Sequence, residues 1–71
     1  MIKEYRKKDI YVDTPFGKMR ADKVKFKRDL SSNVPVKRNP LGFPVAYIKE
    51  EIRCTIVGSY QNKVLIEKYD Y

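Results

Sequence analysis

Three prolines fall within ten residues in the middle of this chain, at Pro35, Pro40 and Pro44. Proline lacks a backbone N–H and fixes φ, so this stretch can form neither the interior of a helix nor a central strand. We therefore predict an irregular, proline-rich loop over residues 29–44 that separates two folded units. Loops of this length are uncommon in small domains and are often functional.

The first unit, residues 9–28, has the pattern of a β-hairpin. Ile10 and Val12 alternate with Tyr11 and with an acidic residue. The segment 14–17, Thr-Pro-Phe-Gly, has the composition of a tight turn, in which proline presets φ and glycine accepts a positive φ. The unit is therefore predicted to contain two antiparallel strands joined at this turn.

The return strand of this hairpin is predicted over residues 18–27. Its apolar residues change parity between Ala21 and Val24. A strand with period 2 cannot bury both sets on one face, so we expect a bulge or a sharp bend at 22–23. Bent strands of this kind occur where small sheets curl into barrels.

The second unit, residues 45–71, is also predicted to be mainly β. A set of apolar residues shares one parity: Ala46, Ile48, Ile52, Cys54 and Ile56. A turn is expected at 58–63 and a return strand at 64–69. A short helix near 45–52 is the alternative, because some of these apolar residues also fit one helical face.

Together the two units predict one mostly β domain over residues 1–71, with five or six short antiparallel strands. The expected architecture is a small barrel of the SH3-like or OB-like type. The length suffices for one core and is too short for two domains. We expect Leu41 and Phe43 to tuck beneath the loop as a lid on this core. The fold class alone implies no function.

The residues that most catalytic and metal sites use are scarce. The chain has no histidine and one cysteine, and its only adjacent acidic pair is Glu50-Glu51, whose side chains point to opposite faces on a strand. A zinc site needs about four Cys, His or acidic ligands. We therefore expect no enzyme activity, no metal site and no cofactor.

Cys54 lies within an apolar alternation, so we predict a buried core residue rather than a reactive thiol. One cysteine cannot form an internal disulfide, which indicates a reducing compartment. No apolar run approaches the roughly 20 residues that span a bilayer, and residues 1–6 do not resemble a signal peptide. The expectation is a cytoplasmic protein with no membrane partner.

The positive charge is concentrated in one half of the chain. The formal net charge is +7, from sixteen basic and nine acidic residues. Residues 1–38 hold twelve bases and five acids, whereas residues 39–71 hold four of each. Such an asymmetry indicates a polyanionic partner.

Within the basic half, Lys23, Lys25 and Lys27 alternate with two apolar residues. On a strand these lysines would form an outward row with a spacing of about 6.6 Å, which suits a phosphate backbone. Alternating lysines also keep an exposed edge strand soluble and unpaired, so both interpretations stay open. Residues 6–8, Arg-Lys-Lys, are either part of the same patch or a charged chain end.

The predicted binding residues are basic side chains for phosphates and two aromatic side chains for stacking on bases. The basic candidates are Lys18, Arg20, Lys23, Lys25, Lys27, Arg28, Lys37 and Arg38. The aromatic candidates are Tyr11, beside the basic hairpin, and Phe16, at the turn tip.

These features favour a small nucleic-acid-binding protein with low sequence specificity and a preference for single strands, since no helix is offered to a major groove. The runner-up is a protein-interaction module or inhibitor that docks on an acidic partner surface, such as a viral or mobile-element accessory protein. An exposed edge strand could also pair two copies into a homodimer. A structural subunit of a ribosome-like or virion-like assembly is the third possibility.

Overall fold

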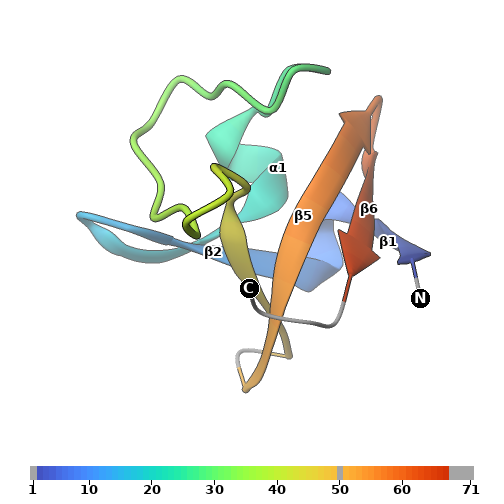
Figure 1. The fold of residues 1–71 in the computed structure, drawn as a ribbon, viewed down its shortest axis with the longest axis horizontal. Helices are drawn as coiled ribbons and strands as arrows, with labels where there is room; N and C mark the ends of the chain where they lie inside the picture. The colour runs from blue at the N-terminus through green and yellow to red at the C-terminus, as the bar shows by residue number, and fades with distance from the viewer. Residues whose placement is uncertain (1, 50, 68–71) are drawn as a thin grey trace.

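The computed structural model describes residues 2–49 and 51–67, which form one antiparallel sheet with a single turn of α-helix and one of 3-10 helix (Figure 1). The six strands are β1 (Ile2–Arg6), β2 (Ile10–Thr14), β3 (Gly17–Arg20), β4 (Val45–Ile48), β5 (Ile52–Tyr60) and β6 (Lys63–Glu67). The 3-10 turn η1 (Lys7–Asp9) joins β1 to β2, and the helix α1 (Ala21–Val24) follows β3.

The strand order is β1-β6-β5-β4-β2-β3, and every neighbouring pair is antiparallel. β1 and β2 lie far apart in this order although only the three residues of η1 join them. The sheet must therefore curl so that its two ends approach each other. Within the described part of the chain no ladder joins β1 to β3. The mostly β antiparallel prediction is confirmed, whereas closure into a barrel is not.

The core lies on the inner face of the curled sheet. Its fully buried strand residues are Ile10, Val12, Ala46, Cys54, Ile56, Val64 and Ile66. Ala21 and Val24 of α1 join the same cluster, so α1 lies against this face. Cys54 is buried as predicted, and burial raises the pKa of its thiol to about 11. The thiol is therefore protonated near neutral pH.

The predicted return strand over 18–27 is wrong beyond Arg20, because the chain turns there into α1. Ala21 and Val24 are three residues apart, which places both on one side of a helical turn, and both are fully buried. Lys25 then adopts the left-handed conformation with φ 57° and ends the helix. The apolar residues do change parity between Ala21 and Val24, but a helical turn produces this change rather than a bulge in a strand.

The helix alternative near 45–52 is also wrong. Residues 45–48 form β4, which pairs with β2 and β5. Ile52 shares the parity of the core residues yet is 50% exposed, because it lies at the start of β5, where the sheet ends. The predicted end of the last strand at Tyr69 lies outside the described residues. β1 was not predicted.

The predicted loop over 29–44 is confirmed, with one isolated bridge between Arg38 and Pro44. Lys37 inserts between β2 and β4 where these strands diverge: its N–H donates to the Asp13 carbonyl and its carbonyl accepts from the Val45 N–H, both at 2.9 Å. Phe43 packs against the core as expected, but Leu41 is 62% exposed, so that half of the predicted lid is wrong.

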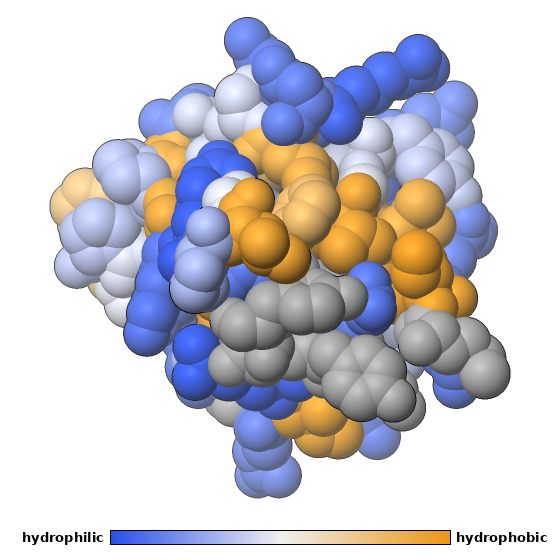
Figure 2. Space-filling view, viewed as in Figure 1, coloured by the Kyte–Doolittle hydropathy of each residue, from blue (hydrophilic) through white to orange (hydrophobic). Residues whose placement is uncertain are grey.

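The outer surface of the molecule is chemically mixed. Figure 2 shows hydrophilic residues around the margin of the viewed face and a band of apolar residues across it. Among the described residues, the large exposed apolar side chains are Ile2, Phe16, Leu41, Ile52 and Tyr60. No helix within residues 2–49 and 51–67 has the length and apolar character that crossing a bilayer requires.

Candidate nucleic-acid interface

Four side chains form a row across the outer face of the sheet. Arg20 of β3 pairs with Tyr11 of β2, Tyr11 pairs with Tyr47 of β4, and Tyr47 pairs with Arg53 of β5. Directly opposed residues in antiparallel strands share a face, so all four side chains emerge on one side. Three strand spacings make the row about 14 Å wide. We call these four residues the outer-face row.

The two tyrosines are half-buried and the two arginines are exposed. Each tyrosine alternates with core residues along its strand, such as Ile10 and Val12 beside Tyr11, which fixes the outward direction of its ring. The row therefore has two aromatic groups in its centre and a guanidinium at each end. Aromatic rings can stack on bases, and guanidinium groups bind phosphates in a bidentate manner.

Lys18 adds a third cation to this face. Its Nζ lies 4.0 Å from the centroid of the Tyr47 ring, a cation–π contact that reaches from β3 across β2 to β4. Arg20 forms an ion pair with Asp22, at 3.4 Å between Nε and Oδ1, and both side chains are more than one third exposed. Such a pair is weak in water, so a phosphate can compete for the guanidinium.

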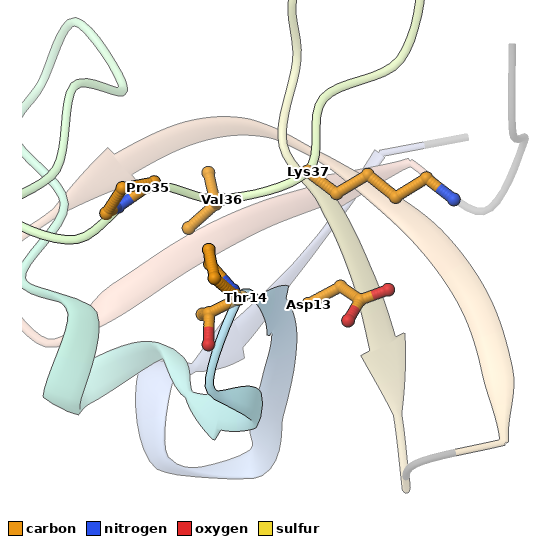
Figure 3. Close-up of a pocket in the computed structure, with 6 residues that line it drawn as sticks. Asp13, Thr14, Pro35, Val36 and Lys37 are labelled. Atoms are coloured by element: carbon orange, nitrogen blue, oxygen red, sulfur yellow. The ribbon is translucent and has the colours of Figure 1, made fainter.

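A groove of about 380 Å³ continues from the row toward the hairpin tip (Figure 3). It lies between the β2–β3 turn and the proline-rich loop, and its lining residues are Asp13, Thr14, Pro15, Pro35, Val36 and Lys37. Asp13 pairs with Lys18 beside the row, and in Figure 3 the side chains of Asp13 and Lys37 extend to the same side. The walls are mainly apolar and one carboxylate is present, so this groove suits a planar apolar group better than a phosphate.

The turn that carries Phe16 is rigidly built. The Thr14 hydroxyl donates to the Gly17 carbonyl at 2.6 Å and accepts from the Phe16 N–H at 3.1 Å. Gly17 adopts φ 101°, a conformation that favours glycine. Phe16 is 81% exposed at the tip, as the sequence predicted. It is therefore presented at the hairpin tip beside the groove and is displaced from the row along the direction of β2 and β3.

The predicted lysine row does not exist as a row on a strand. Lys23 lies on α1, Lys25 ends that helix, and Lys27 lies in the loop after it. All three are exposed, as is Arg28, but α1 packs on the inner face of the sheet. Their side chains therefore lie on a different side of the molecule from the outer-face row. We call residues 21–28 the lysine segment.

Arg38 has structural contacts in the loop. Its guanidinium donates to the Leu30 carbonyl at 2.7 Å and to the Gly42 carbonyl at 3.1 Å. These bonds connect the two ends of the loop. A guanidinium held in this way has fewer donors left for a phosphate.

The acidic residue that directly follows the lysine segment, Asp29, is held in a turn by Ser31. The Ser31 hydroxyl donates to the Asp29 carboxylate at 2.7 Å and the Ser31 N–H donates to it at 3.0 Å. These bonds hold the pKa of Asp29 below its usual value. No three His, Cys, Asp or Glu side chains gather within metal-binding reach in residues 2–49 and 51–67.

Sequence reasoning found Tyr11, Lys18 and Arg20 but missed Tyr47 and Arg53. A signal for both was present, because each has the parity opposite to the core residues Ala46 and Cys54. Their cross-strand pairing with β2 could not be read from parity alone. Comparisons with protein-family models, with curated proteins and with solved structures gave no match.

Proposed function

We propose that this protein binds single-stranded nucleic acid across the outer face of its sheet. The observation that carries the proposal is the outer-face row, in which two adjacent tyrosines stand between two arginines on four paired strands. Bases stack on the tyrosines, and the arginines with Lys18 bind the flanking phosphates.

A single strand fits this surface better than a duplex. Stacking on a tyrosine requires an unpaired base whose face is free, and the outer side of a sheet offers no helix for a major groove. The row is about 14 Å wide, which leaves room for only a few nucleotides. Recognition by stacking and phosphate contacts predicts low sequence specificity.

The compartment and the type of sheet are part of the same proposal. The unpaired, buried Cys54 supports a reducing, cytoplasmic environment. The three-residue link between β1 and β2 supports a curled sheet related to SH3-like or OB-like barrels. Such curled sheets provide an outer face and loops for binding.

Fluorescence anisotropy with labelled oligonucleotides tests the proposal. We expect a single-stranded 12-mer to bind more tightly than its duplex, with affinity falling by more than tenfold between about 50 and about 200 mM salt, because phosphate contacts release counterions. Equal binding of the two forms would reject the stacking role of the tyrosines. An absence of binding at low salt would favour an acidic protein as the partner of the basic face.

A further inference from the structure

A second cleft lies apart from the outer-face row, where η1 meets α1 and the turn between β5 and β6. It has a volume of about 320 Å³, and its lining residues are Arg6, Lys7, Lys8, Asp22 and Asn62. We call it the η1 cleft. Three of its five lining residues are basic, whereas the groove beside the hairpin tip has one basic residue, Lys37, among six.

Lys7 is the unusual member of this group. It is only 8% exposed, and its N–H donates to the Asn62 carbonyl at 2.8 Å, which anchors η1 to the turn. Within the described residues its ammonium has neither an ion-pair nor a hydrogen-bond partner, and loss of solvation lowers its pKa. The Lys7 side chain is largely buried while its ammonium still reaches solvent at the cleft, where a bound anion would compensate for the solvation that it has lost.

The charges around the cleft do not cancel. Arg6 pairs with Asp9 at 3.0 Å, and Asp22 pairs with Arg20 at 3.4 Å. Among the residues that the structure describes, these contacts leave Lys7 and Lys8 as the two lining cations without a carboxylate partner. The side-chain amide of Asn62 adds polar hydrogen-bonding capacity to the same walls.

We propose that the η1 cleft binds a phosphate group, with Lys7 and Lys8 as the charged ligands. A dianionic phosphate matches two uncompensated ammonium groups and accepts several hydrogen bonds at once. Two sources share this chemistry: the terminal phosphate of an oligonucleotide and a small phosphate monoester. The site stands on its own residues and does not depend on nucleic-acid binding by the outer-face row.

NMR titration of the ¹⁵N-labelled protein with inorganic phosphate tests this site. At constant ionic strength, we expect saturable shifts confined to residues 6–8 and to the backbone of Asp22 and Asn62. Lys7→Gln should weaken the phosphate Kd by about tenfold or more, the size expected for a charge-assisted hydrogen bond. Lys3→Gln, which removes an equally positive but exposed side chain from β1, should leave the Kd unchanged.

Shifts that match those in sodium chloride, or that persist unchanged in Lys7→Gln, would overturn the proposal. Because Lys7 is buried, Lys8→Gln provides a second variant at an exposed position and should also weaken binding severalfold. The double variant Lys18→Gln, Arg53→Gln leaves the Arg20–Asp22 ion pair intact and should retain phosphate binding at the cleft, so failure of the outer-face row and failure of the cleft are distinguishable.

The source of the phosphate is resolved by comparing three probes. A 5′-phosphorylated trinucleotide, the same trinucleotide with a 5′-hydroxyl, and glycerol phosphate are titrated separately. Tighter binding of the phosphorylated trinucleotide than of glycerol phosphate supports a nucleic-acid end, and the reverse order supports a small monoester. Equal shifts at the cleft with both trinucleotides would contradict a site for a terminal phosphate group.

Discussion

The outer-face row and the lysine segment are both basic and both exposed, yet they are built differently. In the row, cross-strand pairing between four strands sets the spacing of Arg20, Arg53 and the tyrosines between them. In the lysine segment the exposed cations follow a helical turn, a left-handed residue and a loop. The two regions therefore both carry positive charge but differ in how firmly the fold fixes their side chains.

The difference has a physical basis in preorganisation. A β ladder holds neighbouring side chains about 5 Å apart before any ligand arrives, so little ordering is left for binding. Exposed lysines on a short turn and a loop have many rotamers and must be ordered by the ligand. Under the proposed function, we therefore expect the lysine segment to raise the rate of encounter with polyanions and the row to supply the lasting contacts.

The largest predicted effect comes from removing three charges either from the outer-face row and Lys18 or from the lysine segment. Lys18→Gln, Arg20→Gln, Arg53→Gln should lower the affinity for a single-stranded 12-mer by about 100-fold at low salt and reduce the salt slope by about two to three. Lys23→Gln, Lys25→Gln, Lys27→Gln removes the same net charge from the lysine segment. It should weaken binding by less than about tenfold.

Anisotropy titrations at several salt concentrations give both quantities for the two triple variants. Circular dichroism spectra confirm that each variant is folded before the affinities are compared. Equal losses in both variants would mean that net charge, and not the arrangement of the row, determines binding.

The next largest predicted effect concerns the contribution of the lysine segment to stability. Val24 of α1 is fully buried in the core cluster. Val24→Ala should lower the free energy of unfolding by about 1–3 kcal/mol, because it removes two buried methyl groups and leaves a cavity. Urea denaturation measures this loss.

The exposed neighbour Lys23 supplies the control for Val24. Lys23→Ala should change the free energy of unfolding by no more than about 0.5 kcal/mol. The folded fraction of Val24→Ala should bind the 12-mer as the parent does. A marked loss of affinity in folded Val24→Ala protein would show that the lysine segment contributes to the binding surface.

A smaller effect separates stacking from charge within the row itself. Tyr47→Leu should weaken binding of the single-stranded 12-mer by about tenfold, since stacking on an aromatic ring contributes about 1–3 kcal/mol per base. Tyr47→Phe keeps the ring and should remain within about twofold of the parent. If Leu and Phe at this position bind equally well, the ring is not a stacking group and the role of Tyr47 is to support Lys18.

Features of this molecule that depend on local rules were predictable from the sequence. Parity identified the inner face correctly at Ile10, Val12 and Cys54, because burial on a sheet has a strict period of 2. The turn at 14–17 and the proline-rich loop follow from residues with restricted backbone angles. These local rules act without knowledge of the partner strands.

The helical structure of the lysine segment was not predicted, because a helical and a strand periodicity both fit the same residues. Ala21 and Val24 indicate a helical turn by their separation of three, whereas the alternation of lysines suggests a strand. Four residues are too few for helix propensity to decide, so packing on the inner face decides instead. The outer-face row could not be predicted without knowing that β2 pairs with β4. This pairing brings Tyr11 and Tyr47 together although the proline-rich loop separates them in the sequence. Likewise, nothing local to residues 6–8 indicates that Lys7 is buried.

The smallest predicted effect is at Lys25. A direct phosphate contact at this residue and attraction of polyanions from a distance predict different effects of its removal on binding affinity. Lys25 has φ 57°, a left-handed conformation that costs an L-residue about 1 kcal/mol and that glycine adopts freely. Lys25→Gly should therefore raise the free energy of unfolding by about 0.5–1 kcal/mol, with part of the gain offset by the greater freedom of glycine in the unfolded chain.

Lys27→Gly is the matched control, because it removes the same charge at a position without a positive φ and should be destabilising. Both variants should bind the 12-mer within about twofold of the parent if the segment only attracts polyanions from a distance. Urea midpoints and anisotropy together check the two expectations. A stabilised Lys25→Gly protein that loses affinity, while Lys27→Gly retains it, would establish Lys25 as a direct phosphate contact and would extend the binding surface around the edge of the sheet to α1.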